Sequence, residues 1–442
     1  MMNTPICDFV AAYAASDTLR LHMPGHKGSE PLDITEVRGA DSLYDATGII
    51  RRSEENASRL FDCHTFYATE GSSQCIRAMV QLAYQEGLRR GRKPVIAAGR
   101  NTHRTFLTAA AMLDLQITWL YGEEEASYLS CPVTPEQVEK TLAPMEEKPF
   151  AVYLTSPDYL GNMADVAGIS RVCRKFGCLL LVDNAHGAYL RFLENTLHPM
   201  DLGADLCCDS AHKTLPVLTG GAYLHIRESA LASQAKNALA MYGSTSPSYL
   251  ILQSLDRVNP LLETWKPSLG SFLGKLADMR NRLEENGYVF LGDEPMKLTL
   301  DAKAYGYTGD ALADSLRGQG VECEFSDPDF LVLMPAPGME DNQLARLEQA
   351  LLSIPQKPAL TQRPPSLAEW EQALSVRRAM LSPAETVPVG ESLGRILASP
   401  CVGCPPAVPI VICGQRINEA AIAAFRYYGI THIAVTEESI EI

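Results

Sequence analysis

The chain of 442 residues lacks the features of several protein classes. No apolar run approaches the ~18 residues that a transmembrane helix requires, so we expect no membrane span. Lys and Arg number 38 against 53 Asp and Glu, and the net charge of −15 argues against a nucleic-acid partner, because phosphate binding needs a clustered basic surface. The stretch from Met1 to Ala15 lacks the basic start of a secretory signal, so we expect a cytoplasmic protein.

Motifs for nucleotide, disulfide and metal chemistry are also missing. There is no GxxxxGK[ST] sequence, which leaves an NTP-binding loop unsupported. The 12 cysteines are scattered through long periodic segments, which predicts reduced thiols rather than a disulfide framework. Cys401 and Cys404 have CxxC spacing without a second pair, so we interpret them as ordinary thiols in a loop. Pro24 between His22 and His26 breaks any helix there, and no metal site is predicted.

What the chain does contain is a regular alternation of apolar strands and helical stretches between Thr65 and Ile226. Strands that read as continuous apolar runs and are separated by helices predict a mostly parallel sheet covered by helices, an α/β fold. The strands are expected at Thr65–Thr69, Pro94–Ala98, Gln116–Tyr121, Ala151–Thr155, Cys178–Asp183, Asp205–Asp209 and Ala222–Ile226. The helices are expected from Gly71 to about Arg90 and at Thr102–Leu113, Glu136–Leu142 and Ile169–Phe176.

Three further parts follow along the chain. A long helical region runs from Pro247 to about Asn286, and a small α+β domain comes next. Its expected elements are Lys297–Asp301, Asp310–Gly318, Val321–Phe325, Phe330–Met334 and Asp341–Leu352. We therefore predict a large domain over 1–290, the small domain over 291–356, a Pro-rich linker over 357–365, and a C-terminal α/β unit over 366–442.

An acid and a lysine mark the most specific chemistry in the sequence. Asp183 ends an apolar strand, and Lys213 follows another strand in the segment Asp209–Thr214. Ligands of α/β sheets bind at the carboxyl ends of strands, where both side chains would lie. Pyridoxal 5′-phosphate (PLP) requires a lysine for its aldehyde and a carboxylate for its pyridinium nitrogen. Taken singly, each residue reads as a cap or a surface side chain; the pair predicts a PLP site.

Hydroxyl and imidazole groups supply the rest of the predicted site. Gly71, Ser72 and Ser73 open a helix after a strand, where N–H groups and the helix dipole favour a phosphate, and Ser210 adds a hydroxyl beside the lysine. Alone, this Gly-Ser-Ser is more often only an N-cap. The candidate histidines are His103, which could stack on the cofactor ring, His186, which could position Asp183 or act directly, and His212.

Motifs spread over nearly the whole chain resemble the ornithine/lysine/arginine decarboxylase family of fold-type I PLP enzymes. The matching segments are Leu21–Gly28 (LHMPGHKG), Asp33–Glu36, Gly39–Leu43, Ser210–Pro216 (SAHKTLP), Thr245–Tyr249 (TSPSY) and Pro405–Pro409 (PPAVP). The chain departs from many relatives at Glu70, where they have Asn before Gly71. Because LHMPGHKG starts at Leu21, the sequence resembles the short form, without an N-terminal wing domain.

The resemblance implies roles for the matching positions. Lys213 would be the Schiff-base lysine, Asp183 the partner of the pyridine nitrogen, and His103 the ring-stacking residue. The residues around the phosphate and the lysine would be Ser72, Ser73, Ser210 and His212. The TSPSY segment resembles one that reaches a neighbouring subunit's cofactor, which implies a homodimer or higher oligomer.

The expected reaction is decarboxylation of a basic amino acid, as in polyamine-type metabolism. On the resemblance, arginine is the first choice, lysine the second and ornithine the third. Glu36 and Asp41 are candidates to pair with the substrate side chain, although each could be a solvated or capping residue. Two alternatives stay open: another fold-type I reaction (aminotransferase or lyase), or a catalytically silent regulatory homologue, against which the retention of Lys213 and Asp183 argues.

Overall fold

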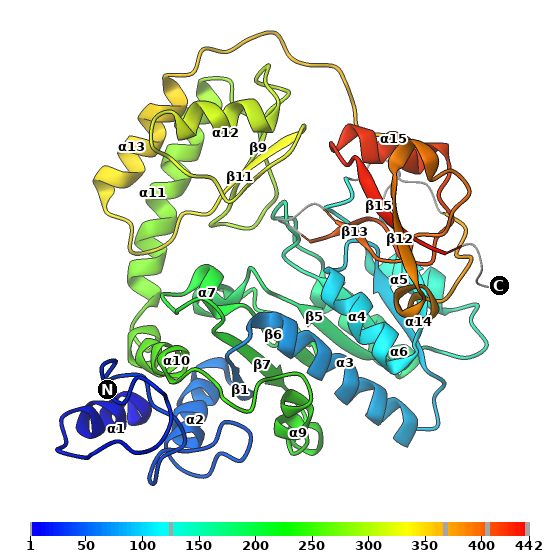
Figure 1. The fold of residues 1–442 in the computed structure, drawn as a ribbon. Coiled ribbons are helices and arrows are strands. Elements are labelled where there is room, and N and C mark those ends of the chain that lie inside the picture. The colour runs from blue at the N-terminus through cyan, green and yellow to red at the C-terminus, as the bar shows by residue number, and fades with distance from the viewer. Residues whose placement is uncertain (1, 123–126, 366–369, 403–406, 438–442) are drawn as a thin grey trace. The chain divides into compact units, whose positions relative to one another are not determined.

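A computed structural model describes residues 2–122, 127–365, 370–402 and 407–437 (Figure 1). The chain forms two compact units, each assembled from separate segments. The first unit comprises Met1–Ala97, Val138–Ser156 and Asp165–Pro267. The second unit comprises Ala98–Gln137, Pro157–Ala164 and Ser268–Ile442. The division into 1–290, 291–356, 357–365 and 366–442 follows different boundaries and stays a prediction.

The first unit is built on a central sheet whose strands neighbour one another in the order β1-β7-β6-β5-β4. Their bounds are β1 (His64–Ala68), β4 (Ala151–Thr155), β5 (Leu179–Asp183), β6 (Leu206–Asp209) and β7 (Ala222–Ile226). Strand β2 (Val95–Gly99), which begins in this unit, lies next to β4. Strands β4, β5 and β6 run parallel, while β7 pairs antiparallel with both β6 and β1. The predicted α/β class with a mostly parallel sheet is confirmed.

Helices cover this sheet because its strands are apolar on both faces. Every residue of β5, β6 and β7 is buried, so none of these three strands alternates between buried and exposed positions. Helix α3 (Gly71–Arg89) lies across the strands in Figure 1 and contacts β1, β4, β5, β6 and β7. The remaining helices of the unit are α1 (Pro5–Ala14), α2 (Ile49–Phe61), α6 (Val166–Phe176), η1 (Ala188–Phe192), α7 (Ala211–Thr214), α8 (Ser229–Ala232), α9 (Ala235–Ala240) and α10 (Tyr249–Leu262).

One buried acid attaches the N-terminal helix to this unit. Asp256 on α10 accepts hydrogen bonds from the backbone N–H groups of Ile6 and Cys7, both at 2.9 Å, through Oδ2. Its Oδ1 accepts from the hydroxyl of Ser53 on α2 at 2.6 Å. The first turn of α1 needs acceptors for its unpaired N–H groups, and Asp256 supplies them from a distant part of the sequence.

The second unit holds smaller sheets. Four strands form an antiparallel sheet in the order β10-β11-β9-β8: β8 (Phe290–Leu291), β9 (Leu298–Asp301), β10 (Phe325–Ser326) and β11 (Phe330–Leu333). Two strand pairs lie near the C-terminus: β12 (Ala384–Pro388) with β15 (His432–Thr436), and β13 (Cys401–Val402) with β14 (Pro409–Val411). The other elements are β3 (Gln116–Leu120), α4 (Arg104–Leu113), α12 (Gly309–Arg317), α13 (Asp341–Leu352), α14 (Val376–Leu381), η2 (Val389–Glu391) and α15 (Glu419–Tyr427). Helices α5 (Pro135–Leu142) and α11 (Lys266–Glu285) span the unit boundaries.

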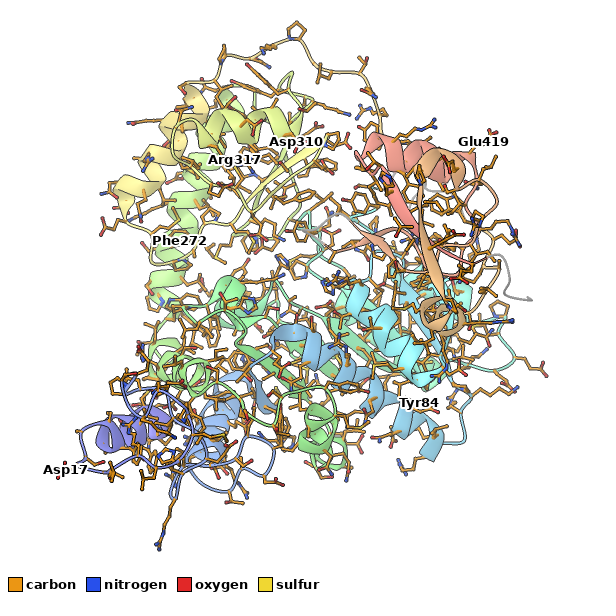
Figure 2. The ribbon with its side chains drawn as sticks, viewed as in Figure 1. Asp17, Tyr84, Phe272, Asp310, Arg317 and Glu419 are labelled. Atoms are coloured by element: carbon orange, nitrogen blue, oxygen red, sulfur yellow. The ribbon has the colours of Figure 1, made fainter. Side chains whose placement is uncertain are left out.

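Charge at the two ends of α12 shows local sequence agreeing with local structure. Figure 2 labels Asp310 and Arg317, which occupy the first and last turns of this helix. An acid near the N-terminus and a base near the C-terminus complement the helix dipole, and the hydroxyl of Thr308 caps the N–H of Ala311.

Most predicted elements coincide with observed ones to within a few residues, and one does not. The predicted strand Val321–Phe325 is wrong except at its last residue, since β10 covers only Phe325–Ser326. The N–H of Val321 donates to the carbonyl of Leu316 and closes the end of α12, so its β-branched side chain does not mark a strand. Cys401 begins β13, whereas Cys404, Pro405 and Pro406 lie outside the described residues. Among the described residues, no helix combines the length and apolarity needed to cross a membrane.

Candidate active site

The lysine of the predicted cofactor site lies directly after β6. Ser210 is the N-cap residue of the short helix α7, which carries Lys213. The Nζ atom of Lys213 lies 3.0 Å from Nε2 of His186. Because the lysine nitrogen donates, Nε2 of His186 accepts this hydrogen bond through its ring lone pair. The imidazole therefore lies within hydrogen-bond distance of the lysine amine.

Asp183 ends β5, the strand beside β6, and is only 2% exposed. Its Oδ2 accepts from the phenol of Tyr153 at 3.1 Å, and its Oδ1 accepts from the N–H of Ala185 at 3.2 Å and the thiol of Cys208 at 3.6 Å. Burial raises the pKa of Asp183, and the hydrogen bond of Tyr153 and the charge of Lys213 offset this only in part. Such a carboxyl group gains from a cationic partner, which the protonated pyridine ring of PLP would provide.

Hydroxyl groups from two elements meet at the start of α3. The Oγ of Ser210 donates to the Oγ of Ser72 at 2.8 Å, so the residue before α7 and the first turn of α3 are joined. Gly71 has φ of +70°, and its N–H donates to the carbonyl of Gly220 at 2.8 Å. This backbone N–H is therefore already used. The phosphate donors that remain at this end of α3 are the serine hydroxyls and the following helical N–H groups, and this donor set fits a phosphate.

The ring of His212 is oriented by the start of β7. Its Nδ1 lies 3.0 Å from the carbonyl oxygen of Gly221, so Nδ1 carries the proton and donates. The backbone N–H of His212 donates to the same carbonyl at 3.2 Å. A Cβ added at Gly71 would lie 4.0 Å from Cε1 of His212, so the ring borders the serine loop.

Two further predicted residues have clear local positions. His103 is the N-cap residue of α4, and its Nδ1 accepts from the N–H of Thr105 at 3.2 Å. It belongs to the second unit, and its ring-stacking role stays a prediction. Ser73 lies in the first turn of α3 beside Ser72. In the first unit, the structure thus brings together Asp183, His186, Lys213, Ser72, Ser210 and His212.

The acids considered for the substrate side chain have different roles. Asp41 is buried and accepts from the N–H groups at the start of α2; the closest are Gly48 at 2.6 Å and Ile50 at 3.0 Å. It is a helix cap, which was the plainer interpretation. Glu36 is exposed, and the hydroxyl of Thr35 donates to it at 2.6 Å. No contact in the described residues assigns Glu36 to a substrate.

Sequence reasoning missed the partners that hold the site. Tyr153, Cys208 and Asn184 contact the two strand-end acids, yet each reads as an ordinary part of an apolar strand or a turn. A tyrosine within a buried strand is the signal that could have been used, because a buried phenol nearly always has a hydrogen-bond partner. Asp209, an acid inside a buried strand, was a second such signal.

Comparison with known proteins gives a consistent match. The family model described as "Orn/Lys/Arg decarboxylase, major domain" matches residues 31–344. An "Arginine decarboxylase" of Bacillus subtilis (strain 168) is 29% identical over 464 residues, covering 95% of this chain and 92% of that protein. "Lysine decarboxylase LdcA" of Pseudomonas aeruginosa is 24% identical over 283 residues, covering 56% of this chain and 37% of that protein.

Solved structures agree with the fold. The crystal structure of the Francisella novicida lysine decarboxylase LdcF superposes with a TM-score of 0.82 at 16% identity, covering 98% of this chain and 81% of that one. The constitutive lysine decarboxylase of E. coli gives a TM-score of 0.78 at 17% identity, covering 98% of this chain and 82% of that one. At these identities the likeness establishes the fold, that of the fold-type I PLP enzymes.

Proposed function

This chain belongs to the Orn/Lys/Arg decarboxylase family, and from that membership we propose that it decarboxylates arginine, with lysine as second choice and ornithine as third. It is a PLP-dependent amino-acid decarboxylase acting on a basic amino acid. The preference for arginine is supported by the name of the Bacillus relative, which matches the chain over nearly its full length. The product would be the corresponding amine, as in polyamine metabolism, and we propose a cytoplasmic location.

The observation that carries the proposal is the pair formed by Asp183 and Lys213 at the ends of adjacent strands. When bound, PLP supplies an electron sink for the bond that loses CO₂. In our proposal Lys213 holds the cofactor covalently, and Asp183 keeps the ring nitrogen protonated. Burial raises the pKa of Asp183 because it disfavours the charged carboxylate. A protonated ring nitrogen next to it would stabilise the carboxylate, and the carboxylate would in turn stabilise the protonated ring.

The remaining residues orient groups and move protons. Ser72 and Ser210 would bind the phosphate through their adjoining hydroxyls, and His103 would stack on the ring. His186 contacts Lys213 in the structure and would orient the amine for attack. The proton that returns to the substrate carbon would come from Lys213 or His212.

A homodimer or larger oligomer is part of the proposal. Thr245 and Ser246 of the TSPSY segment are exposed, so they are open to a second copy. Leu19 and Leu21 are 79% and 82% exposed in the N-terminal segment. Neighbouring exposed apolar side chains often mark a protein interface. Mass photometry should therefore give a species of at least twice the chain mass, and a monomer at micromolar concentration would contradict this part.

Covalent labelling tests the site assignment. Purified protein supplied with PLP should be yellow, and borohydride should fix the cofactor to the peptide that contains Lys213. Lys213→Ala should lose the label and at least about a thousandfold in kcat, since both the linkage and a proton carrier are removed. Lys175→Ala, on a surface lysine paired with Glu139, is the matched control and should keep both. Label on another lysine would overturn the assignment.

An amine-product screen tests the reaction and its substrate. Arginine, lysine and ornithine are supplied separately, and CO₂ and amine are measured without any added 2-oxo acid. One substrate should be preferred by at least about tenfold in kcat/KM, which is ~1.4 kcal/mol of differential transition-state binding. A requirement for a 2-oxo acid would indicate an aminotransferase instead. Labelled protein without turnover of any amino acid would favour the silent homologue.

A further inference from the structure

A buried polar cluster surrounds the last residue of β6. Asp209 is fully buried, and its Oδ2 accepts from Nε2 of His198 at 3.1 Å and from Nε2 of His225 at 3.0 Å. Its Oδ1 accepts from the amide of Asn184 at 2.7 Å. Burial raises the pKa of Asp209, but the two histidines outweigh it and hold that pKa well below its usual range. The residue is therefore a buried carboxylate with three N–H donors.

The cluster is a hydrogen-bond network rather than a cation site. His198, Cys207 and Asp209 have ligand atoms close enough to one another to suggest a metal. However, the N–H of Met200 donates to Nδ1 of His198 at 3.4 Å, so the proton of this ring is on Nε2. A protonated Nε2 donates to Asp209 and cannot bind a metal at the same atom. Burial also raises the pKa of Cys207 and keeps its thiol protonated.

The network leads from Asp209 into the turn that follows Asp183. The N–H of Asn184 donates to the carbonyl of Cys208 at 3.0 Å, and its own carbonyl accepts from the N–H of Gly187 at 2.8 Å. A Cβ at Gly187 would lie 1.9 Å from Oδ1 of Asn184, so the amide packs directly against that glycine. The turn is thus fixed between Asp183 at one end and His186 near the other.

We propose that Asp209 is a positioning residue for the decarboxylase site: through Asn184 it ties the turn between Asp183 and His186 to the end of β6, which leads into the helix that carries Lys213. The inference rests on the proposed function and adds a residue to it. Asp209 stands four positions before Lys213 on one strand end, and Asn184 directly follows Asp183 on the neighbouring one. The hydrogen bond between Asn184 and Asp209 therefore sets the distance between Asp183 and Lys213 without using either of these two side chains.

A carboxylate is needed here because His198, His225, Asn184 and the thiol of Cys207 all donate to it. An asparagine would turn an N–H toward a donor and leave at least one partner unpaired in the core. The negative charge also favours cations nearby, so it should stabilise the protonated form of the lysine-linked cofactor. Burial raises the pKa of Cys63, Cys75, Cys207, Cys208 and Tyr223, and the charge of Asp209 adds to that rise. Burial lowers the pKa of His225, and the charge of Asp209 offsets this in part.

The test compares Asp209→Asn with Asn184→Ala and the double variant. Each single variant should lower kcat at least about tenfold, while KM for the amino acid changes less than about threefold. Because both changes break the same hydrogen bond, the kcat of the double variant should be no lower than that of the less active single variant. In Asp209→Asn, the pH at which the bound cofactor changes its visible absorbance should fall by about one unit, since a nearby anion is lost. That titration needs no turnover.

The control variant, Thr65→Val, removes a hydrogen bond to His225 in the same cluster and leaves the bond between Asp209 and Asn184 intact. Thr65 Oγ1 lies 3.0 Å from Nδ1 of His225, so Thr65→Val should lower the melting temperature but keep kcat within about twofold and leave the absorbance titration unchanged. If Asp209→Asn does not fold, Asn184→Ala breaks the same bond and decides the question. Wild-type absorbance behaviour and kcat in both variants would overturn the inference. Wild-type protein that does not bind PLP would instead overturn the proposed function.

Discussion

Strands β5 and β6 both end in a buried aspartate, and the pKa values of the two carboxyl groups are shifted in opposite directions. Asp183 accepts from a phenol, one peptide N–H and a thiol, at 3.1 to 3.6 Å. Asp209 accepts from two imidazoles and an amide, at 2.7 to 3.1 Å, and from the thiol of Cys207 at 3.7 Å. Burial raises the pKa of Asp183, whereas the two imidazoles overcome burial and lower that of Asp209. The kind and closeness of the donors, rather than depth, thus decide the direction in which each pKa shifts.

The difference suits the two proposed tasks. A carboxyl group that its surroundings leave only partly compensated is suited to bind a cation, and Asp183 is the one proposed to meet the pyridine nitrogen. A carboxylate fully supplied with donors has no capacity left for a ligand, and Asp209 is the one proposed to position other groups. The measurements below separate these two states.

The largest effect is expected from removing the charge at the end of β5. Asp183→Asn is nearly isosteric and should keep the fold, but kcat should fall by about three orders of magnitude, since a preorganised charge at the ring nitrogen is lost. Turnover beside circular dichroism checks this. The variant should also lose much more activity than Asp209→Asn. Near-normal turnover with bound PLP would show that another acid pairs with the ring.

A smaller loss is expected when only a donor to Asp183 is removed. Tyr153→Phe deletes the phenol that holds Oδ2, at a typical net cost of about 1 kcal/mol for one hydrogen bond, or roughly fivefold to tenfold in kcat. The affinity for PLP is measured in parallel by fluorescence titration. A loss as large as that of Asp183→Asn would mean that the phenol itself takes part in the chemistry.

The smallest expected effect is a change of a few degrees in the melting temperature of the cofactor-free protein. Its dependence on pH should have opposite signs for substitutions of the two acids. The folded-state pKa of Asp183 lies above the usual value of 3.8, so its contribution to stability falls as pH rises through and above that value. The folded-state pKa of Asp209 lies below 3.8, so its contribution is present above that pH and is lost as pH falls. Relative to wild type, Asp183→Asn should therefore gain stability toward neutral pH, and Asp209→Asn toward acid pH. Parallel melting curves from pH 3 to 8 would contradict this contrast.

The sequence predicted the two strand ends but not what holds them. The strands predicted at Ala151–Thr155 and Ala222–Ile226 coincide with β4 and β7, because a short apolar run bounded by turn residues is typical of a buried strand. Asp183 and Lys213 were found since chemistry restricts which residue types can serve a cofactor. Tyr153 and Asn184 were missed because their contacts join elements far apart in sequence. One-dimensional periodicity carries no information on such pairings.

The segmented layout of the two units has a consequence for how the protein is made and for what can be cut from it. The chain changes unit after Ala97, Gln137, Ser156, Ala164 and Pro267. During synthesis the first unit cannot close until Pro267 has left the ribosome, and a strand such as β1 must wait for β7, translated some 150 residues later. No single contiguous gene fragment encodes either unit without part of the other. A shortened version that lacks β7 would leave the edge of β1 unpaired, and unpaired strand edges promote aggregation.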